Sequence, residues 1–380
     1  MNVPKIRFNG FEEEWQENKL CDIAKITMGQ SPNSENYTND SNDTLLIQGN
    51  ADLNNGKVIP RLFTKQITKT CDKNDIIMTV RAPVGDIAIS NYNACIGRGV
   101  CSIKSSKFVY HYLDYLKMKD YWKKISKGST IDSITSDDIK SLLIKTPTKK
   151  EEEKIIKTID LINKKIELQT KKIEDLKLFK KGLLYKEFND KQKNKKLSDC
   201  FKFGKAGGTP KSTVKEYYDG SIPFLSISDM TSQGKYLERT EKSISELGLN
   251  SSSAWLVPSN SLIISMYASY GLVSINKIDL ATSQAMFDMI IKDEDNNEYI
   301  YYYLYYLYIT NYYDSIVSTG TQPNLNAEQL KNLFLYMPSR EEQLKISKKF
   351  ITFDKKINLE TNKLIKLVEL KKGLMQSMFV

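Results

Sequence analysis

Two long lysine-rich segments of this chain repeat one another. Residues 147–188 read PTKKEEEKIIKTIDLINKKIELQTKKIEDLKLFKKGLLYKEF, and residues 338–379 read PSREEQLKISKKFITFDKKINLETNKLIKLVELKKGLMQSMF. The two copies are 191 residues apart, so that Pro147 corresponds to Pro338 and Phe188 to Phe379. A repeat of this length holds a whole domain and a helix, unlike the short units of a solenoid. We therefore expect a molecule with pseudo-twofold symmetry.

The apolar residues of both segments follow a heptad pattern. Alternating steps of four and three residues define the seam of a coiled coil, and they connect Ile155, Ile159, Ile162, Ile166, Ile173, Leu176 and Leu183 in the first segment. Polar residues interrupt the two seams at equivalent places, at Gln169 and Lys180 and again at Glu360 and Lys371. We expect two antiparallel helices, each of about 40 residues and therefore roughly 60 Å long.

The repeat continues upstream of the helices. The loop GQSP at 29–32 matches GGTP at 207–210, and the apolar run 76–80 matches 262–266. Apolar, β-branched runs bounded by turn residues predict buried strands. The expected fold class is α+β, with two mixed α/β domains separated by two long antiparallel coiled-coil helices. The expected boundaries are 1–147 and 191–338 for the domains and 148–190 and 339–380 for the helices.

A tyrosine-rich segment occurs in each domain, at 112–125 and at 303–316, and its spacing is helical. We expect these tyrosines to line one side of each domain; stacking on nucleic-acid bases is the alternative interpretation. His111, the one histidine of the chain, is expected to be a partly exposed residue of the first of these helices.

Charge is unevenly distributed along the chain. The formal net charge is +10, but residues 149–196 carry 16 Lys against 9 acidic residues, and residues 340–380 carry 10 Lys or Arg against 5. The rest of the chain is therefore slightly acidic. A solvated helix face or an acidic partner would explain the basic helices.

Several function classes are disfavoured by the composition. A single histidine excludes a multi-histidine metal site within one chain, and no Asp-Pro-Pro-Tyr or Asn-Pro-Pro-Phe methyltransferase tetrapeptide occurs. The five cysteines are odd in number and form no C-x-x-C pair, as expected for reduced thiols in a cytoplasmic protein. No apolar run is long enough to span a membrane, and the polar start predicts no signal peptide. We expect a protein that acts by binding.

The ordered set of motifs resembles the specificity subunits of type I restriction-modification systems. The resemblance rests on the opening from Pro4 to Trp15, the Gly-Ser/Thr-Thr/Gln loop, the Pro before each long helix, the Lys-Lys-Gly-Leu near its end, and the recurrence of this layout. It covers essentially the whole chain. It implies two target recognition domains that read a bipartite, asymmetric site in double-stranded DNA, and a chain that is not itself an enzyme.

The same resemblance implies partners and a cofactor. Members of this family recruit two modification subunits, which bind S-adenosylmethionine and methylate adenine, and often two restriction subunits. No cofactor is expected in this chain, and S-adenosylmethionine is expected in the modification subunit.

Candidate DNA-binding residues come from the loops. Backbone in a glycine-rich loop can approach phosphate closely, and arginine suits bidentate contact with guanine. Arg81 and its counterpart Tyr267 follow a strand, in the loop that differs most between the two copies. The full set is Gln30, Ser31, Pro32, Arg81, Arg98, Thr130, Gly207, Gly208, Thr209, Lys211, Tyr267, Tyr270 and Gln322.

Two other functions stay open at this point. The first is a non-enzymatic coiled-coil scaffold with two globular interaction heads. The second is a DNA methyltransferase in its own right, which the missing tetrapeptide disfavours and an S-adenosylmethionine binding assay on the lone chain would test.

Overall fold

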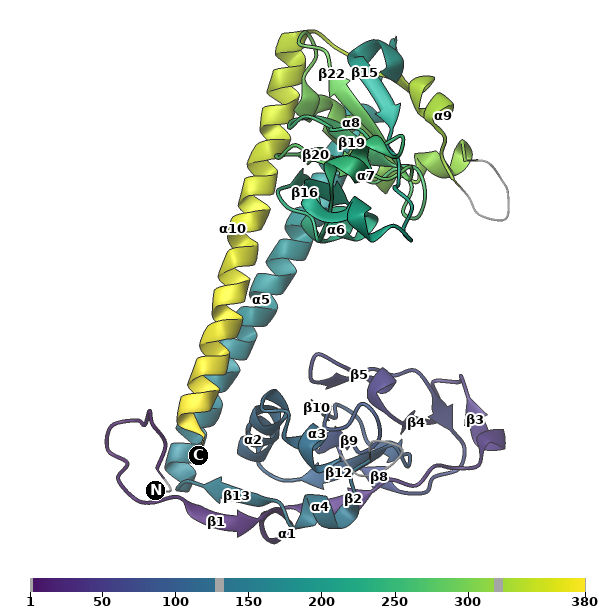
Figure 1. The fold of residues 1–380 in the computed structure, drawn as a ribbon. Coiled ribbons are helices and arrows are strands. Elements are labelled where there is room, and N and C mark those ends of the chain that lie inside the picture. Colours follow the sequence, from purple (N-terminus) through teal and green to yellow (C-terminus); the bar gives the residue numbers. More distant parts are fainter. Residues whose placement is uncertain (1–2, 127–132, 318–323, 380) are drawn as a thin grey trace. The chain divides into compact units, whose positions relative to one another are not determined.

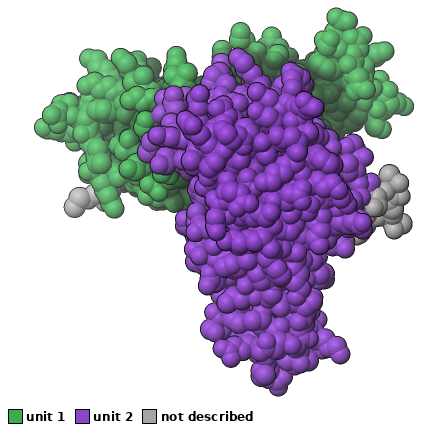
Figure 2. Space-filling view, turned by 90° about the horizontal axis from the view of Figure 1, so that it is seen from above, with its two compact units in different colours: residues 1–170, 362–380 green, residues 171–361 purple. Residues whose placement is uncertain are grey.

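The computed structural model describes residues 3–126, 133–317 and 324–379 (Figure 1). The chain divides into two compact units, which Figure 2 colours separately. Unit 1 comprises residues 1–170 and 362–380, and unit 2 comprises residues 171–361. Each unit therefore contains one mixed domain together with part of each long helix. The domain boundaries expected from the sequence stay a prediction, and each unit is described by itself.

The mixed domain of unit 1 is built from short strands and, within the described residues, four α-helices and two short 3-10 helices. Its elements are β1 (Gln16–Lys19), α1 (Leu20–Ile23), β2 (Lys25–Met28), β3 (Tyr37–Thr38), β4 (Thr44–Ile47), β5 (Leu53–Asn54), β6 (Lys57–Val58), β7 (Phe63–Thr64), β8 (Thr70–Cys71), β9 (Ile76–Thr79), β10 (Ile87–Ile89), β11 (Ala94–Ile96), β12 (Val100–Lys104), α2 (Lys107–Met118), α3 (Tyr121–Ile125), α4 (Ser136–Lys140) and β13 (Leu143–Thr146). The strands form sheets in the orders β2-β12-β9-β10-β6-β5, β3-β7-β4-β11-β8 and β1-β13.

The mixed domain of unit 2 repeats the central part of this plan. Its elements are β14 (Lys195–Lys196), β15 (Phe201–Ala206), β16 (Tyr218–Leu225), α6 (Ile227–Gln233), β17 (Tyr236–Leu237), β18 (Lys242–Ile244), α7 (Glu246–Asn250), β19 (Leu262–Ser265), β20 (Val273–Asn276), β21 (Ala281–Thr282), β22 (Met286–Ile291), α8 (Asn297–Ile309), α9 (Ala327–Lys331) and β23 (Phe334–Leu335). The sheets are ordered β15-β22-β19-β20-β17, β18-β16-β21 and β14-β23.

Strand register confirms the internal repeat. In unit 1, Ile77 of β9 pairs with Ser102 of β12, and in unit 2 Ile263 of β19 pairs with Asp288 of β22. The order β2-β12-β9-β10-β6 thus corresponds strand by strand to β15-β22-β19-β20-β17. The α+β fold class expected from the sequence is confirmed.

Both long helices form as expected. α5 spans Lys149–Phe188 and α10 spans Arg340–Met378. Within unit 2 the two helices run antiparallel, because Lys172 pairs with Glu360 at 3.0 Å whereas Lys349 pairs with Glu187 at 3.0 Å. No residue of the predicted seams is exposed. No helix in the described part of the chain is long and apolar enough to cross a membrane.

A phenylalanine at the end of a long helix completes each core. In unit 2 the ring of Phe188 lies 4.9–5.7 Å, between ring centroids, from Tyr299, Tyr303 and Tyr306 of α8. In unit 1 the ring of Phe379 lies 5.3–5.6 Å from Phe108, Tyr112 and Tyr115 of α2. α2 and α8 therefore each pack between a sheet and the long helices of their own unit (Figure 1). The tyrosine-rich helices belong to the cores, so their buried rings are not platforms for bases.

Candidate nucleic-acid interface

Three loops of unit 1 meet at one end of its central sheet. The hairpin loop between β9 and β10 is joined to its neighbours on both sides through Val80. The N–H of Val80 donates to the carbonyl of Gly99 at 2.9 Å, and its carbonyl accepts from the N–H of Ile134 at 2.9 Å. Arg81 adds a bridge to Ser133. The loop at 81–85 and the loop at 97–99 therefore lie side by side, next to Ser133 and Ile134.

The predicted 29–32 loop joins the same cluster. The N–H of Gln30 donates to Ile96 O at 2.8 Å, and the N–H of Arg98 donates to Ser31 Oγ at 3.1 Å. Gln30 and Arg98 are exposed, whereas Pro32 is buried and shapes the loop. Four sequence-predicted residues, Gln30, Ser31, Arg81 and Arg98, are thus brought together by the fold.

Unit 2 presents the equivalent cluster. The N–H of Met266 donates to Ala285 O at 2.7 Å, the N–H of Leu325 donates to Met266 O at 2.9 Å, and the N–H of Gly207 donates to Met286 O at 3.2 Å. These bonds join the 207–209 loop, the loop at 267–271 and the loop at 283–285. Each of the three bonds has a counterpart in unit 1, so the two clusters share one architecture.

The two glycines of unit 2 are needed for internal packing. A Cβ on Gly207 would lie 2.2 Å from Thr282 Oγ1, and one on Gly208 would lie 2.4 Å from the backbone nitrogen of Ala254. Both glycines are buried, while Thr209 and Lys211 beside them are exposed. The glycines therefore have a packing role within the domain, and the approach of this loop to DNA phosphate stays a prediction.

Tyrosine side chains mark the exposed loop of unit 2. Tyr267 is 44% exposed, and the hydroxyl of Tyr270 donates to Asp314 Oδ1 at 2.7 Å. Between them, Ala268 and Ser269 have φ angles of 32° and 56°. Two consecutive non-glycine residues in the left-handed region store backbone strain, a feature that clusters at ligand-binding sites.

Sequence reasoning missed Gln284. This exposed residue stands two positions before Met286, as Arg98 stands two before Val100, and its side-chain oxygen accepts a hydrogen bond from the hydroxyl of Thr209. Aligning β12 with β22 would have identified it, because the repeat offset shortens to 186 residues there. Glutamine suits bidentate contact with adenine, as arginine suits guanine.

Two predicted residues, Thr130 and Gln322, lie outside the described residues. With the residues that the structure describes, the guanidinium groups of Arg81 and Arg98 form no ion pair. No group of three His, Cys, Asp or Glu side chains among the described residues could hold a metal ion.

A buried carboxyl lies beneath the cluster of unit 2. Asp288 Oδ2 accepts hydrogen bonds from Thr282 Oγ1 at 2.7 Å and from Trp255 Nε1 at 3.1 Å. The carbonyl of Thr282 in turn holds the N–H of Gly208 at 2.9 Å. Burial raises the pKa of Asp288 to about 7, because the charged form loses its hydration. This carboxyl supports the 207–209 loop from inside the domain.

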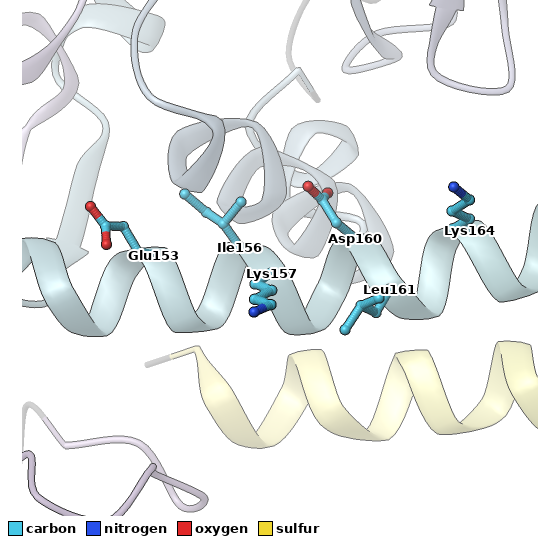
Figure 3. Close-up of a pocket in the computed structure, with 6 residues that line it drawn as sticks. All are labelled: Glu153, Ile156, Lys157, Asp160, Leu161 and Lys164. Atoms are coloured by element: carbon cyan, nitrogen blue, oxygen red, sulfur yellow. The ribbon is translucent and has the colours of Figure 1, made fainter.

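His111 is completely buried, so its expected position as a partly exposed residue was wrong. Its Nε2 lies 3.0 Å from Asp160 Oδ1 of α5, and burial lowers the pKa of the imidazole to about 4. Figure 3 shows Asp160 among the residues that line a shallow hollow on α5, together with Lys157, Leu161 and Lys164. The hollow is open and lined by one helix, and Asp160 there anchors α2 to α5.

Comparisons with known proteins agree with this architecture. The family model described as "Type I restriction modification DNA specificity domain" matches residues 12–178 and again residues 189–370. A putative type I restriction enzyme MjaX specificity subunit from Methanocaldococcus jannaschii is 36% identical over 180 residues, which are 45% of this chain and 42% of that protein. The HindI specificity subunit from Haemophilus influenzae is 30% identical over 168 residues, which are 43% of this chain and 36% of that protein. Each match spans less than half the length of the relative.

Two solved structures share the fold. One is a chain from a study of complex assembly and conformational transition in the type I R-M system. It matches with a TM-score of 0.66 at 16% identity, and the match covers 98% of the present chain and 99% of the solved chain. The type I restriction-modification S subunit from M. genitalium has a TM-score of 0.58 at 18% identity, and covers 100% of this chain and 99% of that one.

Proposed function

We propose a function for this chain on the basis of its family. The chain belongs to the type I restriction modification DNA specificity domain family, whose model matches it twice. The proposed role is the non-catalytic DNA-recognition subunit of a type I restriction-modification complex. In this role each unit reads one half of a bipartite, asymmetric site in double-stranded DNA.

One observation carries this proposal. The two units repeat the same loop cluster at the same end of the same sheet, yet they present different exposed side chains there. Arg81 and Arg98 of unit 1 are replaced by Tyr267 and Gln284 in unit 2. Base edges in the major groove are distinguished by the donors and acceptors they meet. A common scaffold with different side chains therefore suits two half-sites of different sequence.

The remaining predicted residues take supporting roles in this proposal. Gln30, Ser31, Thr209 and Lys211 flank the reading loops and would contact phosphate or sugar, which fixes position without reading sequence. Tyr270 would support Tyr267. The contacts of Thr130 and Gln322, which lie outside the described residues, stay a prediction.

We propose that two modification subunits bind this chain and supply both S-adenosylmethionine and the methyl-transfer chemistry, and that two restriction subunits join where the system cleaves DNA. The role also implies a cytoplasmic protein, in agreement with its five free cysteines. The charge distribution supports the need for partners. Outside the basic helices the chain is close to neutral, whereas phosphate neutralisation supplies most DNA affinity. The lone chain should bind DNA weakly, and the assembled complex tightly.

The decisive experiment maps methylated adenines across the genome by single-molecule sequencing, with and without this gene. One bipartite motif should disappear when the gene is deleted and return on complementation. An unchanged set of motifs, in cells that express the modification subunit, would contradict the proposal. S-adenosylmethionine binding by the lone chain would instead favour a methyltransferase.

A further inference from the structure

The exposed loops at 81–83 and 267–269 are each closed by the same set of buried hydrogen bonds, which we call the clasp and which is centred on Thr79 in unit 1 and on Ser265 in unit 2. Each hairpin strand that leads into its loop, β9 or β19, ends in a completely buried hydroxyl residue, Thr79 in unit 1 and Ser265 in unit 2. Each hydroxyl reaches across the loop that follows it. The sequence similarity between the two loops themselves is low, so the clasp is what the two copies have kept in common.

The clasp has the same bonds in both units. Thr79 Oγ1 donates to Pro83 O at 2.7 Å and accepts from the N–H of Asp86 at 2.9 Å. Ser265 Oγ donates to Ser269 O at 2.7 Å and accepts from the N–H of Leu272 at 3.1 Å. In both loops the hydroxyl therefore bonds to the residues four and seven positions later. It satisfies the carbonyl of the third exposed loop residue and the N–H of the residue just before the returning strand, β10 or β20.

A glycine packed on an aromatic ring completes each clasp. A Cβ on Gly85 would lie 2.3 Å from Cδ1 of Trp122, and one on Gly271 would lie 2.2 Å from Cδ2 of Tyr313. The N–H of each glycine donates to the carbonyl of the clasp residue, at 2.9 Å for Gly85 and 2.8 Å for Gly271. The base of each loop is thus fixed at the hydroxyl, at the glycine and at the ring.

The exposed apex differs between the two units at its first and third positions. Residues 81–83 are Arg-Ala-Pro, residues 267–269 are Tyr-Ala-Ser, and all six are exposed. A rigid buried base under a variable exposed apex is the arrangement expected where side chains must meet bases within a fraction of an ångström.

We propose that Thr79 and Ser265 are positioning residues, each of which holds the base-reading apex of its own unit in the shape that recognises one half-site. This inference rests on the proposed function. It assigns to the hydroxyls a role in specificity that goes beyond the stability of the sheet. Without the hydroxyl, the apex would sample several shapes, and discrimination between bases would fall in that half-site alone.

The test uses the full complex with its modification subunits and compares Thr79→Val with Ser265→Ala. Methylation rates on a panel of sites with single substitutions in either half-site give the discrimination of each unit. Thr79→Val should lower discrimination about tenfold in one half-site, and Ser265→Ala should do so in the other, since a buried hydrogen bond contributes on the order of a tenfold factor. Thr79→Ser and Ser265→Thr, which retain the hydroxyl, should keep discrimination at the wild-type level.

Matched controls separate specificity from stability. Ser90 and Ser261 are also buried hydroxyl residues that cap loops, with Ser90 Oγ donating to Tyr92 O and Ser261 Oγ donating to Pro258 O, both at 2.7 Å. They follow β10 and precede β19, at the end of the hairpin away from the apex. Ser90→Ala and Ser261→Ala should reduce thermal stability without changing discrimination in either half-site.

Several results would overturn the inference. If Thr79→Val and Ser265→Ala leave discrimination unchanged, the hydroxyls do not position the apex. The same conclusion follows if either variant lowers discrimination equally in both half-sites. Failure of both hydroxyl-free variants to assemble would assign the clasp to folding alone. A wild-type complex that methylates no bipartite motif would refute the proposed function itself. The measurement on the wild-type complex is independent of the variants.

Discussion

In both units the tyrosine-rich helix is anchored to a long helix through an aspartate, but the group that meets the aspartate differs. In unit 1, α2 is anchored to α5 through His111 and Asp160. At the position 191 residues later, Tyr302 of α8 donates its hydroxyl to Asp354 of α10 at 2.5 Å. Asp354 also pairs with Lys180, and the Lys235 ammonium lies 3.8 Å from it. A neutral imidazole thus takes the place of a phenol and its surrounding lysines. The comparison teaches that an aspartate of a long helix holds α2 and α8 alike, although the two aspartates are not equivalent in the repeat and have different neighbours, Lys107 beside Asp160 and two lysines beside Asp354.

The largest difference between the junctions should appear on removal of the aspartate. Asp354→Ala leaves Lys180, whose side chain is 11% exposed, without its counterion, whereas Lys235 keeps Glu298 at 2.5 Å. An uncompensated buried charge costs about 3 kcal/mol or more. Asp160→Ala should cost less, about 1 kcal/mol, because it leaves a neutral imidazole and the half-exposed Lys107. Hydrogen exchange of the α8 and α2 amides measures each cost, and equal costs would show that the charge difference has no energetic consequence.

The reading loops offer a second contrast. Arg81→Ala should weaken recognition of one half-site by about 1–3 kcal/mol and leave the other intact, the loss expected for one bidentate base contact. Tyr267→Ala should affect only the opposite half-site. Methylation of sites substituted in one half at a time measures both. A uniform loss across the two half-sites would indicate a phosphate contact or a structural role for Arg81.

The two units should also respond to pH in opposite directions. The folded-state pKa of His111 is lowered to about 4, from about 6.5 in an unfolded chain. Unit 1 therefore loses stability as the pH falls from about 6.5 to about 4, because the unfolded state binds the extra proton. The pKa of Asp288 is raised to about 7. The stability that its proton contributes to unit 2 is fully present below about pH 4 and is lost as the pH rises towards 7.

Each slope should be about 1 kcal/mol per pH unit within its window. Hydrogen exchange recorded separately for the two units at several pH values between 4 and 7 measures them. His111→Gln should flatten the response of unit 1 only, and Asp288→Asn that of unit 2 only. Parallel pH responses of the two units, unaltered by these substitutions, would disprove the assignment.

The smallest expected effect concerns the backbone of the loops. Ala268 has a φ of 32°, whereas its counterpart Ala82 does not have a positive φ. Ala268→Gly should stabilise unit 2 by about 0.5–1 kcal/mol, because glycine adopts this conformation without a steric penalty. Ala82→Gly should be destabilising by a similar amount, because it only adds freedom to the unfolded chain. Thermal unfolding of the two variants decides the matter, and a destabilising Ala268→Gly would mean that the loop is not strained.

Local patterns account for what the sequence determined by itself. The 191-residue repeat is visible when the sequence is compared with itself. The two long helices and the heptad seams depend on residues within a few turns of one another, and periodicity records such contacts directly. The hairpin strands β9 and β19 were likewise evident from their apolar β-branched runs. The exposed loops that follow them, with Arg81 and Tyr267, could be identified because they differ between two copies of an otherwise similar unit.

Only the tertiary structure decided which loops meet and which groups are buried. The packing of Gly207 against Thr282, the burial of His111 beneath α5 and the pairing of Gln284 with Thr209 each join residues from different parts of the chain. The Thr79 and Ser265 clasps are local in sequence, but a lone hydroxyl at the end of a strand has no distinguishing pattern until the loop closes over it. Contacts between distant segments leave no periodic trace in one sequence, because each partner satisfies its local pattern equally well without the other.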